Sequence, residues 1–290
     1  GLGLGRLFVW VADSGERTPE QFHGTGEIRG GQFIPIRHFD PNNSALEHHD
    51  VFGFASLAVQ DLRADAVGAF MFSRVEDVAV NPADRAQMVM ASTGRGGVFS
   101  DVWGMIYRID IDLDNKSLRD SIEAIEGIPA TITILFDGND AGAGRFRTPD
   151  FGLRSPDNLD WAEDGNIYIQ EDRATVPEEM FGKQSGREAS VWQMNPKSGE
   201  LLRILEIDRT ALPAGQTDME FGTIGAWESS GVVDVSQFFR PDRGSSKHSK
   251  SVALLITVQA HGLQPAWLGA VQDLQWDLVE GGQLLLVQSK

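Results

Sequence analysis

One arrangement of residues occurs three times along the chain, and it limits the folds that the sequence can adopt. Each copy has an acidic residue, a short apolar strand, a turn, and a second apolar strand that ends in polar residues. The copies occupy Arg74–Gly94, Ser155–Asp172 and Ala226–Gly262. The spacing from one copy to the next exceeds the ~40–50 residues of common propeller repeats, so each copy would carry large loop insertions.

Repeats of this kind predict a β-propeller, in which four-stranded sheets surround a central channel. We expect a single all-β propeller domain across residues 1–290. A weaker copy covers Leu274–Leu278 and Gln283–Gln288. About four to five units are visible, and propellers close with ~4–8 blades. Because the chain begins Gly-Leu-Gly, we expect part of the ring to lie upstream of Gly1 and the ring to be incomplete in this chain. The alternative is a β-sandwich whose hairpins are alike by coincidence.

The local pattern agrees with a mainly β chain. Short runs rich in Val, Ile, Phe and Trp are separated by Gly, Asn, Asp and Pro, which is typical of strands closed by turns. The clearest predicted strands are Arg6–Ala12, Gln32–Arg37, Gln87–Ala91, Met105–Ile111, Thr131–Phe136, Asn166–Gln170, Ser190–Asn195, Leu201–Ile207, Val252–Gln259 and Gln283–Gln288. Helices are predicted only at Val59–Ala66 and Asn115–Ala124.

Composition excludes several classes of function. Asp and Glu total 42 against 25 Lys and Arg, a net charge of −17. A nucleic-acid-binding protein would carry the opposite sign, because its affinity comes from neutralising phosphates. No stretch approaches the ~18 consecutive apolar residues of a transmembrane helix. The 290 residues contain no cysteine, which excludes disulfides, thiolate catalysis and cysteine-ligated zinc or iron–sulfur sites within them.

The acids of the three copies are candidate metal ligands. The innermost strands of a propeller face its axis, so Glu76, Asp157 and Glu228 would converge. Carboxylates gathered at low dielectric repel one another, and a divalent cation removes that repulsion. Calcium would accept six to eight oxygens from side chains, carbonyls and water. The residues that would join this calcium site are Asn158, Glu171 and Asp172. The alternative for each acid is a cap on a strand or turn.

Basic residues flank the same positions. Arg74 precedes Glu76, Arg154 precedes Asp157, and His261 ends the strand opposite the third acid. A guanidinium group binds phosphate or carboxylate through two parallel donors. Arg74, Arg154 and His261 are therefore candidate phosphate-facing residues. Salt bridges that orient the acids, and a histidine satisfied within a turn, are the alternatives.

Four segments, in this order, resemble the PhoX-type alkaline phosphatases and especially their cyanobacterial-like relatives: Phe72–Asp77, Leu153–Leu159, Trp227–Gly231 and Val258–Gly262. The resemblance implies a calcium-dependent propeller phosphatase, periplasmic or extracellular, with an iron–calcium centre that contains Fe³⁺ as well as Ca²⁺. It places Glu76 and Glu228 as metal ligands, with Asp157 as their companion.

The chain departs from the family pattern in two places. The family's metal centre uses a cysteine, and none is present here. The phosphate-contacting arginine expected two residues before the second glutamate is Ala226.

Taken together, the sequence predicts a metal-dependent phosphoesterase, specifically an alkaline phosphomonoesterase that acts on a small phosphate ester. Bound cations would hold the substrate oxygens and activate a water or another oxygen nucleophile. A non-catalytic, calcium-stabilised propeller that serves as a binding or surface scaffold is the main alternative. A propeller lactonase or similar esterase would also use a metal bound in the channel, but no motif in the sequence supports it.

Overall fold

The computed structural model describes residues 5–95, 101–113, 126–175, 177–239, 252–265 and 280–289. The chain is mainly β, as predicted. The strands are β1 (Leu7–Ala12), β2 (Ile28–Ile36), β3 (Val75–Val80), β4 (Gln87–Ser92), β5 (Met105–Ile111), β6 (Ile128–Asp137), β7 (Pro156–Trp161), β8 (Ile167–Glu171), β9 (Ser190–Met194), β10 (Leu201–Glu206), β11 (Gln216–Asp218), β12 (Trp227–Asp234), β13 (Ala253–His261), β14 (Leu263–Pro265) and β15 (Glu280–Gln288). The helices are α1 (Leu57–Ala66), α3 (Ala141–Gly144) and single 3₁₀ turns at Pro41–Asn43, Pro149–Phe151, Glu178–Met180 and Ser236–Phe238.

These elements match most of the predicted ones, and α1 confirms the helix expected at Val59–Ala66. The helix predicted at Asn115–Ala124 lies outside the described residues, as does the segment Leu274–Leu278 of the weaker copy. Among the described residues, no helix is long and apolar enough to cross a membrane.

The chain divides into two compact units. The first contains Gly1–His23, Glu27–Phe72 and Ile109–Thr133, and the second contains Gly24–Gly26, Ser73–Arg108 and Ile134–Lys290. In the first unit, β2 pairs antiparallel with β1 and with the opening half of β6. Trp10 is buried there among aromatic rings, with its centroid 5.5 Å from Phe70 and 6.3 Å from Phe22.

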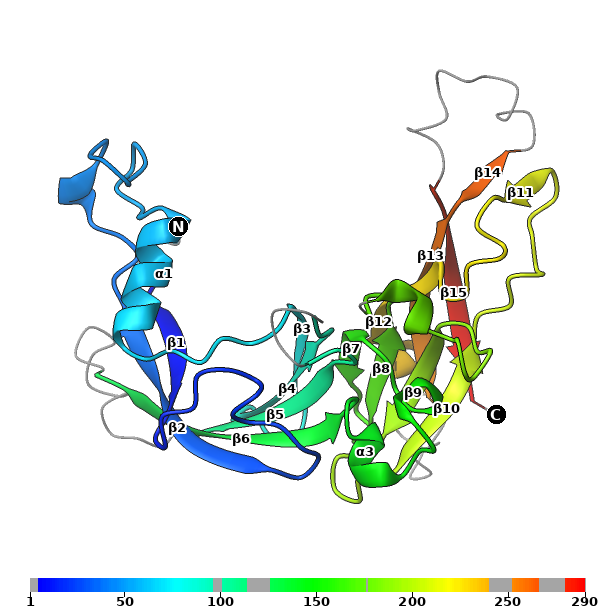
Figure 1. The fold of residues 1–290 in the computed structure, drawn as a ribbon, viewed down its shortest axis with the longest axis horizontal. Coiled ribbons are helices and arrows are strands. Elements are labelled where there is room, and N and C mark those ends of the chain that lie inside the picture. Colours follow the sequence, from blue (N-terminus) through cyan, green and yellow to red (C-terminus); the bar gives the residue numbers. More distant parts are fainter. Residues whose placement is uncertain are drawn as a thin grey trace. The chain divides into compact units, whose positions relative to one another are not determined.

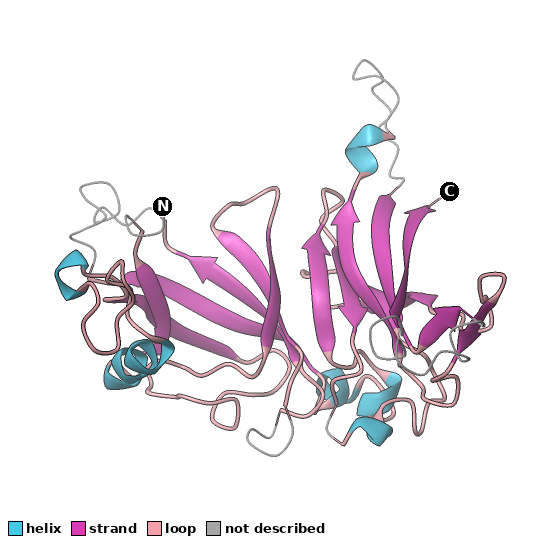
Figure 2. Cartoon of the chain, turned by 90° about the horizontal axis from the view of Figure 1, so that it is seen from above, coloured by secondary structure: helices cyan, strands magenta, loops and turns pink. Residues whose placement is uncertain are grey.

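The second unit contains strands of four sheets. Strands β3 and β4, with the parts of β5 and β6 that lie in this unit, belong to the six-stranded sheet β1-β2-β6-β5-β4-β3. The other sheets are β7-β8-β9-β10, β12-β13-β15 and the two-stranded β11-β14. Figure 1 shows β7 to β10 as neighbouring strands, and Figure 2 shows the strands in magenta. Consecutive strands pair antiparallel in β3–β4, in β7 to β10 and in β12–β13. The sheet of β7 to β10 is therefore a simple meander.

Strands β3, β7 and β12, each at the edge of its sheet, are neighbours. Strand β7 contacts β3 on one side and β12 on the other. The backbone N–H of Leu159 donates to Asp77 Oδ2 at 3.0 Å, and the N–H of Gly231 donates to Asn158 Oδ1 at 2.8 Å. These side-chain bonds satisfy backbone donors that have no ladder partner. They fix the register of β7 against both neighbouring strands.

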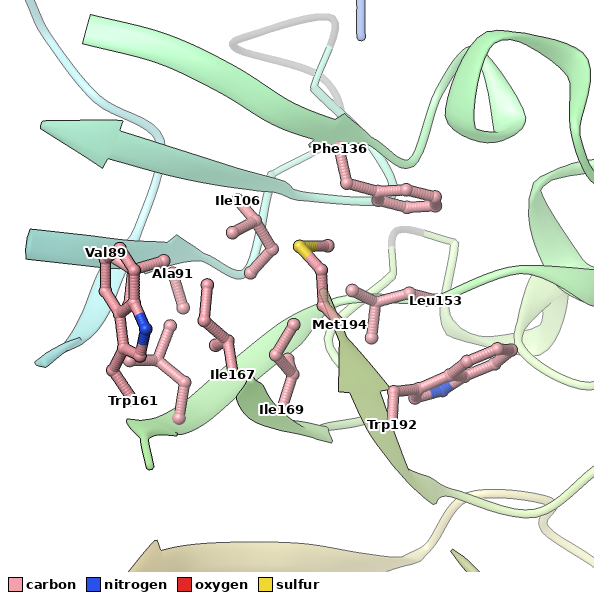
Figure 3. Close-up of a cluster of buried hydrophobic side chains, with 11 residues drawn as sticks. Val89, Ala91, Ile106, Phe136, Leu153, Trp161, Ile167, Ile169, Trp192 and Met194 are labelled. Carbon is pink, nitrogen blue, oxygen red and sulfur yellow. The ribbon is translucent and has the colours of Figure 1, made fainter. Parts of the chain in front are cut away.

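Apolar residues on both faces of β8 hold the sheets of this unit together. Ile167 and Ile169 face a cluster that includes Val89 and Ile106 of the preceding sheet (Figure 3). Tyr168, which alternates with them, packs instead with Ile256 of the following sheet. Side chains alternate between the faces of a strand, so a strand buried on both faces needs a continuous apolar run. Residues 167–169 supply it.

Gly104 lets the start of β5 approach β7 closely. Its φ is +79°, and a Cβ there would lie 2.5 Å from the Cδ of Pro156 and 2.5 Å from the carbonyl oxygen of Ser92. A larger residue at this position would therefore collide with β7 as well as strain the backbone.

Candidate functional site

The first two acids occupy equivalent places in their sheets. The β3–β4 register shifts between Val75 and Asp77, which leaves Glu76 as the extra residue. The β7–β8 register shifts between Pro156 and Leu159, around Asp157. Such bulges redirect side chains and often lie beside functional sites.

The residues that flank these two acids also correspond. Arg74 and Ser155 both have a positive φ, of 50° and 40°. The carbonyl of Arg74 accepts from the N–H of Thr93 at 3.0 Å, and that of Ser155 accepts from the N–H of Asp172 at 3.1 Å. Arg74 therefore corresponds to Ser155, and Thr93 corresponds to Asp172.

The third acid lies in a related place on β12. Trp227 pairs with Ala260 and Glu228 pairs with Gln259, followed by a register shift between Ser229 and Val232. His261 directly follows Ala260, and its Nε2 lies 3.5 Å from Glu228 Oε1. The side chain of Glu228 is largely buried and that of His261 is partly exposed.

Four of the predicted site residues come together at one place, and we call Arg74, Glu76, Asp157 and Asp172 the acid group. Arg74 Nη2 lies 3.5 Å from Glu76 Oε1 and 4.0 Å from Asp172 Oδ2. Burial, followed by the charges of Asp172 and Glu76, raises the pKa of Asp157 to about 6. A hydrogen bond from Thr93 Oγ1 to Asp157 Oδ1, 3.4 Å long, and the charge of Arg74 oppose this rise in pKa.

The acid group contains the types of ligand atom that are found in calcium sites. Its acceptors are all carboxylate oxygens, which calcium prefers. Within the described ranges, however, no three His, Cys, Asp or Glu side chains are already close enough to hold a metal ion together. The cation that now contacts the acids is the Arg74 guanidinium. The ligand types of these residues therefore suit calcium. In the present arrangement, Arg74 balances part of their negative charge.

Arg154 and Glu171 lie in a separate, fully buried ion pair. Arg154 Nη2 donates to Glu171 Oε2 at 2.7 Å and Nε donates to Oε1 at 3.1 Å. The remaining donors reach the Asp150 carboxylate and the carbonyls of Arg187 and Glu188. All five guanidinium N–H groups thus have an acceptor. Arg154, predicted to face phosphate, points into the protein instead.

The carboxylate of Glu171 is likewise occupied by structural hydrogen bonds. Its Oε1 accepts from the backbone N–H of Arg154 at 2.9 Å and from Trp192 Nε1 at 2.9 Å, in addition to the guanidinium. Asn158, the other predicted companion, uses its side-chain oxygen to join β7 to β12. The geometry gives these residues structural contacts, and we leave Arg154 and Glu171 out of the proposed site.

A second buried group of acids was not predicted from the sequence. Asn139 Nδ2 donates to Asp101 Oδ1 at 3.1 Å and to Asp137 Oδ1 at 3.2 Å. Burial, together with the charge of Asp137, raises the pKa of Asp101 to about 7. Nothing in the sequence around Asp101 distinguishes it from an exposed aspartate, because its partners are distant along the chain.

The Asp101 carboxyl should make the stability of the protein depend on pH. Its pKa is about 7 in the folded chain and near the ordinary 3.8 when unfolded. Between these values the folded state holds a proton that the unfolded state has lost, so stability falls as pH rises from 4 to 7. We expect Asp101→Asn to raise the free energy of unfolding by up to about 4 kcal/mol at pH 8 and by little at pH 4.

Urea unfolding at both pH values measures this effect. Asp84→Asn is the matched control, because Asp84 is exposed and caps a turn through one oxygen. An equal gain from Asp101→Asn at both pH values would contradict the explanation.

Comparison with known proteins gives two matches. A family model described as alkaline phosphatase PhoX matches residues 10–217. This range includes Glu76, Asp157 and Asp172 and ends before Glu228 and His261. Among solved structures, the chain is similar to Pseudomonas fluorescens PhoX in complex with vanadate, a transition state analogue, at 17% identity and a TM-score of 0.48. That match covers 87% of this chain and 39% of the other, so the chain spans well under half of its length. No curated protein matches.

Proposed function

Because the chain belongs to the PhoX alkaline phosphatase family, we propose that it carries part of the calcium site of a phosphomonoesterase. The substrate would be a small phosphate ester, hydrolysed under alkaline conditions. Like the activity, a location outside the cytoplasm is proposed from the family resemblance. Since the chain spans only part of the matched structure, the activity is proposed for the protein that contains this chain.

The observation that supports the proposal most is the common placement of the acids on three neighbouring strands. Glu76, Asp157 and Glu228 each lie near the beginning of an edge strand of a sheet, and β7 is joined to β3 and β12 by side-chain hydrogen bonds. A propeller is built from sheets arranged around a central channel, so that strands of successive blades lie next to one another. We therefore propose that the three sheets are blades of one propeller domain and that their acids face its axis.

Each residue has a proposed role that follows from its contacts. Glu76, Asp157 and Asp172 would hold calcium, with Glu228 as a further acid on the adjoining strand. Bound calcium would neutralise charge on the phosphate oxygens. Arg74 would bind the phosphate, because its guanidinium is partly exposed and matches phosphate geometry. His261 lies beside Glu228 as a second phosphate-facing candidate. Iron is not part of the proposal, since these residues contain no cysteine.

Hydrolysis of p-nitrophenyl phosphate by the whole protein, with calcium supplied at alkaline pH, tests this proposal. We expect turnover that chelation abolishes, and a loss of about 100-fold or more in kcat/KM for Glu76→Gln, because removing one charged group at such a site typically has effects of this size. Asp84→Asn provides the control. Absence of turnover in the unmodified protein would contradict the phosphatase proposal.

The scaffold alternative gains support from Ala226, which stands where the family resemblance predicts an arginine. It predicts a large rise in unfolding temperature with calcium but no hydrolysis. The same assay, combined with a thermal unfolding curve, separates the two functions. Under the phosphatase proposal, Glu228→Gln should also reduce hydrolysis.

A further inference from the structure

Arg74 is surrounded by more negative charge than it can neutralise. It forms ion pairs with Glu76 and Asp172, and its charge also acts on Asp157. Three ionised carboxylates against one guanidinium leave a net charge of −2. A single divalent cation can neutralise that remainder, whereas the guanidinium alone cannot.

The contacts of Arg74 are weak compared with those of Arg154. Its ion-pair distances are 3.5 and 4.0 Å, and its guanidinium makes no hydrogen bond to any residue that the structure describes. The side chain is 37% exposed, and Glu76 and Asp172 are also open to solvent. Exposed ion pairs contribute only about 0–1 kcal/mol. Leaving the carboxylates would therefore cost Arg74 little, and its five donors would then be available.

The backbone of Arg74 keeps the side chain at this place. Its φ of +50° is uncommon for a residue other than glycine. The hydrogen bond from Thr93 N–H to the Arg74 carbonyl, 3.0 Å long, holds this conformation at the start of β3. Ser155 has a similar backbone in the next sheet, with a φ of +40°, but its side chain carries no charge, so it supplies no cation to the acids.

We propose that Arg74 is an exchangeable counter-ion that couples calcium binding to anion binding. Without calcium, its guanidinium balances Glu76 and Asp172. When calcium occupies those carboxylates, the guanidinium is released and binds a phosphate-type anion held next to the metal. This inference rests on the proposed calcium site. It adds that calcium and phosphate strengthen each other's binding through one residue, and such coupling is reciprocal.

Calorimetric titration of the whole chain with calcium, with and without inorganic phosphate, tests the exchange. For the unmodified protein we expect phosphate to tighten calcium binding by roughly fivefold or more, within the usual range of coupling between sites. Arg74→Met removes the competing charge and should tighten calcium binding without phosphate by roughly threefold to tenfold, the effect of one charge at this distance in a partly solvated site. Phosphate should then change its calcium affinity by less than twofold.

Two further variants make the result specific. Arg74→Lys retains the charge and should bind calcium as the unmodified protein does, with a smaller phosphate effect because an ammonium lacks the two-pronged donor face. Arg187→Met removes a similar charge from an exposed pair with Glu206 and should change neither quantity.

The outcomes separate this inference from the calcium proposal. If the unmodified protein binds no calcium, both are wrong. If it binds calcium and Arg74→Met binds calcium more weakly, or shows the same enhancement by phosphate, the calcium site stands and the counter-ion exchange is wrong.

Discussion

Replacing Arg154 with methionine is expected to lower the free energy of unfolding by about 3–5 kcal/mol, the usual result when one partner of a buried ion pair is removed. Arg154 and Glu171 are both fully buried, and Asp150 is buried beside them. Methionine fills part of the space but leaves two buried carboxylates without their cation. At roughly 2–4 °C per kcal/mol, the midpoint of thermal unfolding should fall by about 10 °C.

The same variant tests whether Arg154 contributes to phosphate binding directly. Arg17→Met is the control, because it removes an exposed ion pair with Asp65 and should change stability by less than about 1 kcal/mol. If Arg154→Met keeps the stability of the unmodified protein but loses phosphate affinity, the guanidinium faces the ligand and the buried arrangement described here is incorrect.

The second large effect is expected from the acid group. Replacing Glu76 with Gln and Asp172 with Asn together should weaken calcium binding by about 100-fold or more, since affinity at oxygen sites depends on the number of charged ligands. Both substitutions keep the size of the side chains and remove the two carboxylates nearest Arg74. Isothermal titration with calcium measures the change directly.

A matched control for this double variant changes two acids outside the acid group. Asp84→Asn combined with Asp164→Asn removes the same amount of charge from turns, where both residues accept backbone hydrogen bonds. It should alter calcium affinity by less than about threefold, through long-range charge alone. Equal losses in the two double variants would show that net charge, and not the acid group, determines calcium binding.

The sequence named Glu76, Asp157 and Asp172 among the candidate ligands, but it could not show which neighbouring residues share their face. Arg74 lies two residues before Glu76, whereas Arg154 lies three before Asp157. Because side chains alternate along a strand, one residue of offset moves a side chain to the opposite face. The counterpart of Arg74 is therefore Ser155, and Arg154 points inward. Glu171 and Asp172 differ in the same way: the first is buried against Arg154 and the second joins the acid group.

Other features could not be predicted because they depend on packing between distant segments. Asp101 and Asp137 become partners only when β5 and β6 lie side by side and Asn139 bridges them. The mainly β character, by contrast, was predictable because apolar runs and turn residues are local signals. The complete propeller and its single domain stay predictions.

The central claim is that calcium binds at the acid group, and a crystal of the whole protein grown with calcium tests it most directly. Anomalous diffraction should locate an ion at about 2.3–2.6 Å from oxygens of Glu76, Asp157 and Asp172, with the Arg74 guanidinium moved away from Glu76 and Asp172. The claim is contradicted if calcium is absent from these carboxylates while Arg74 still contacts them.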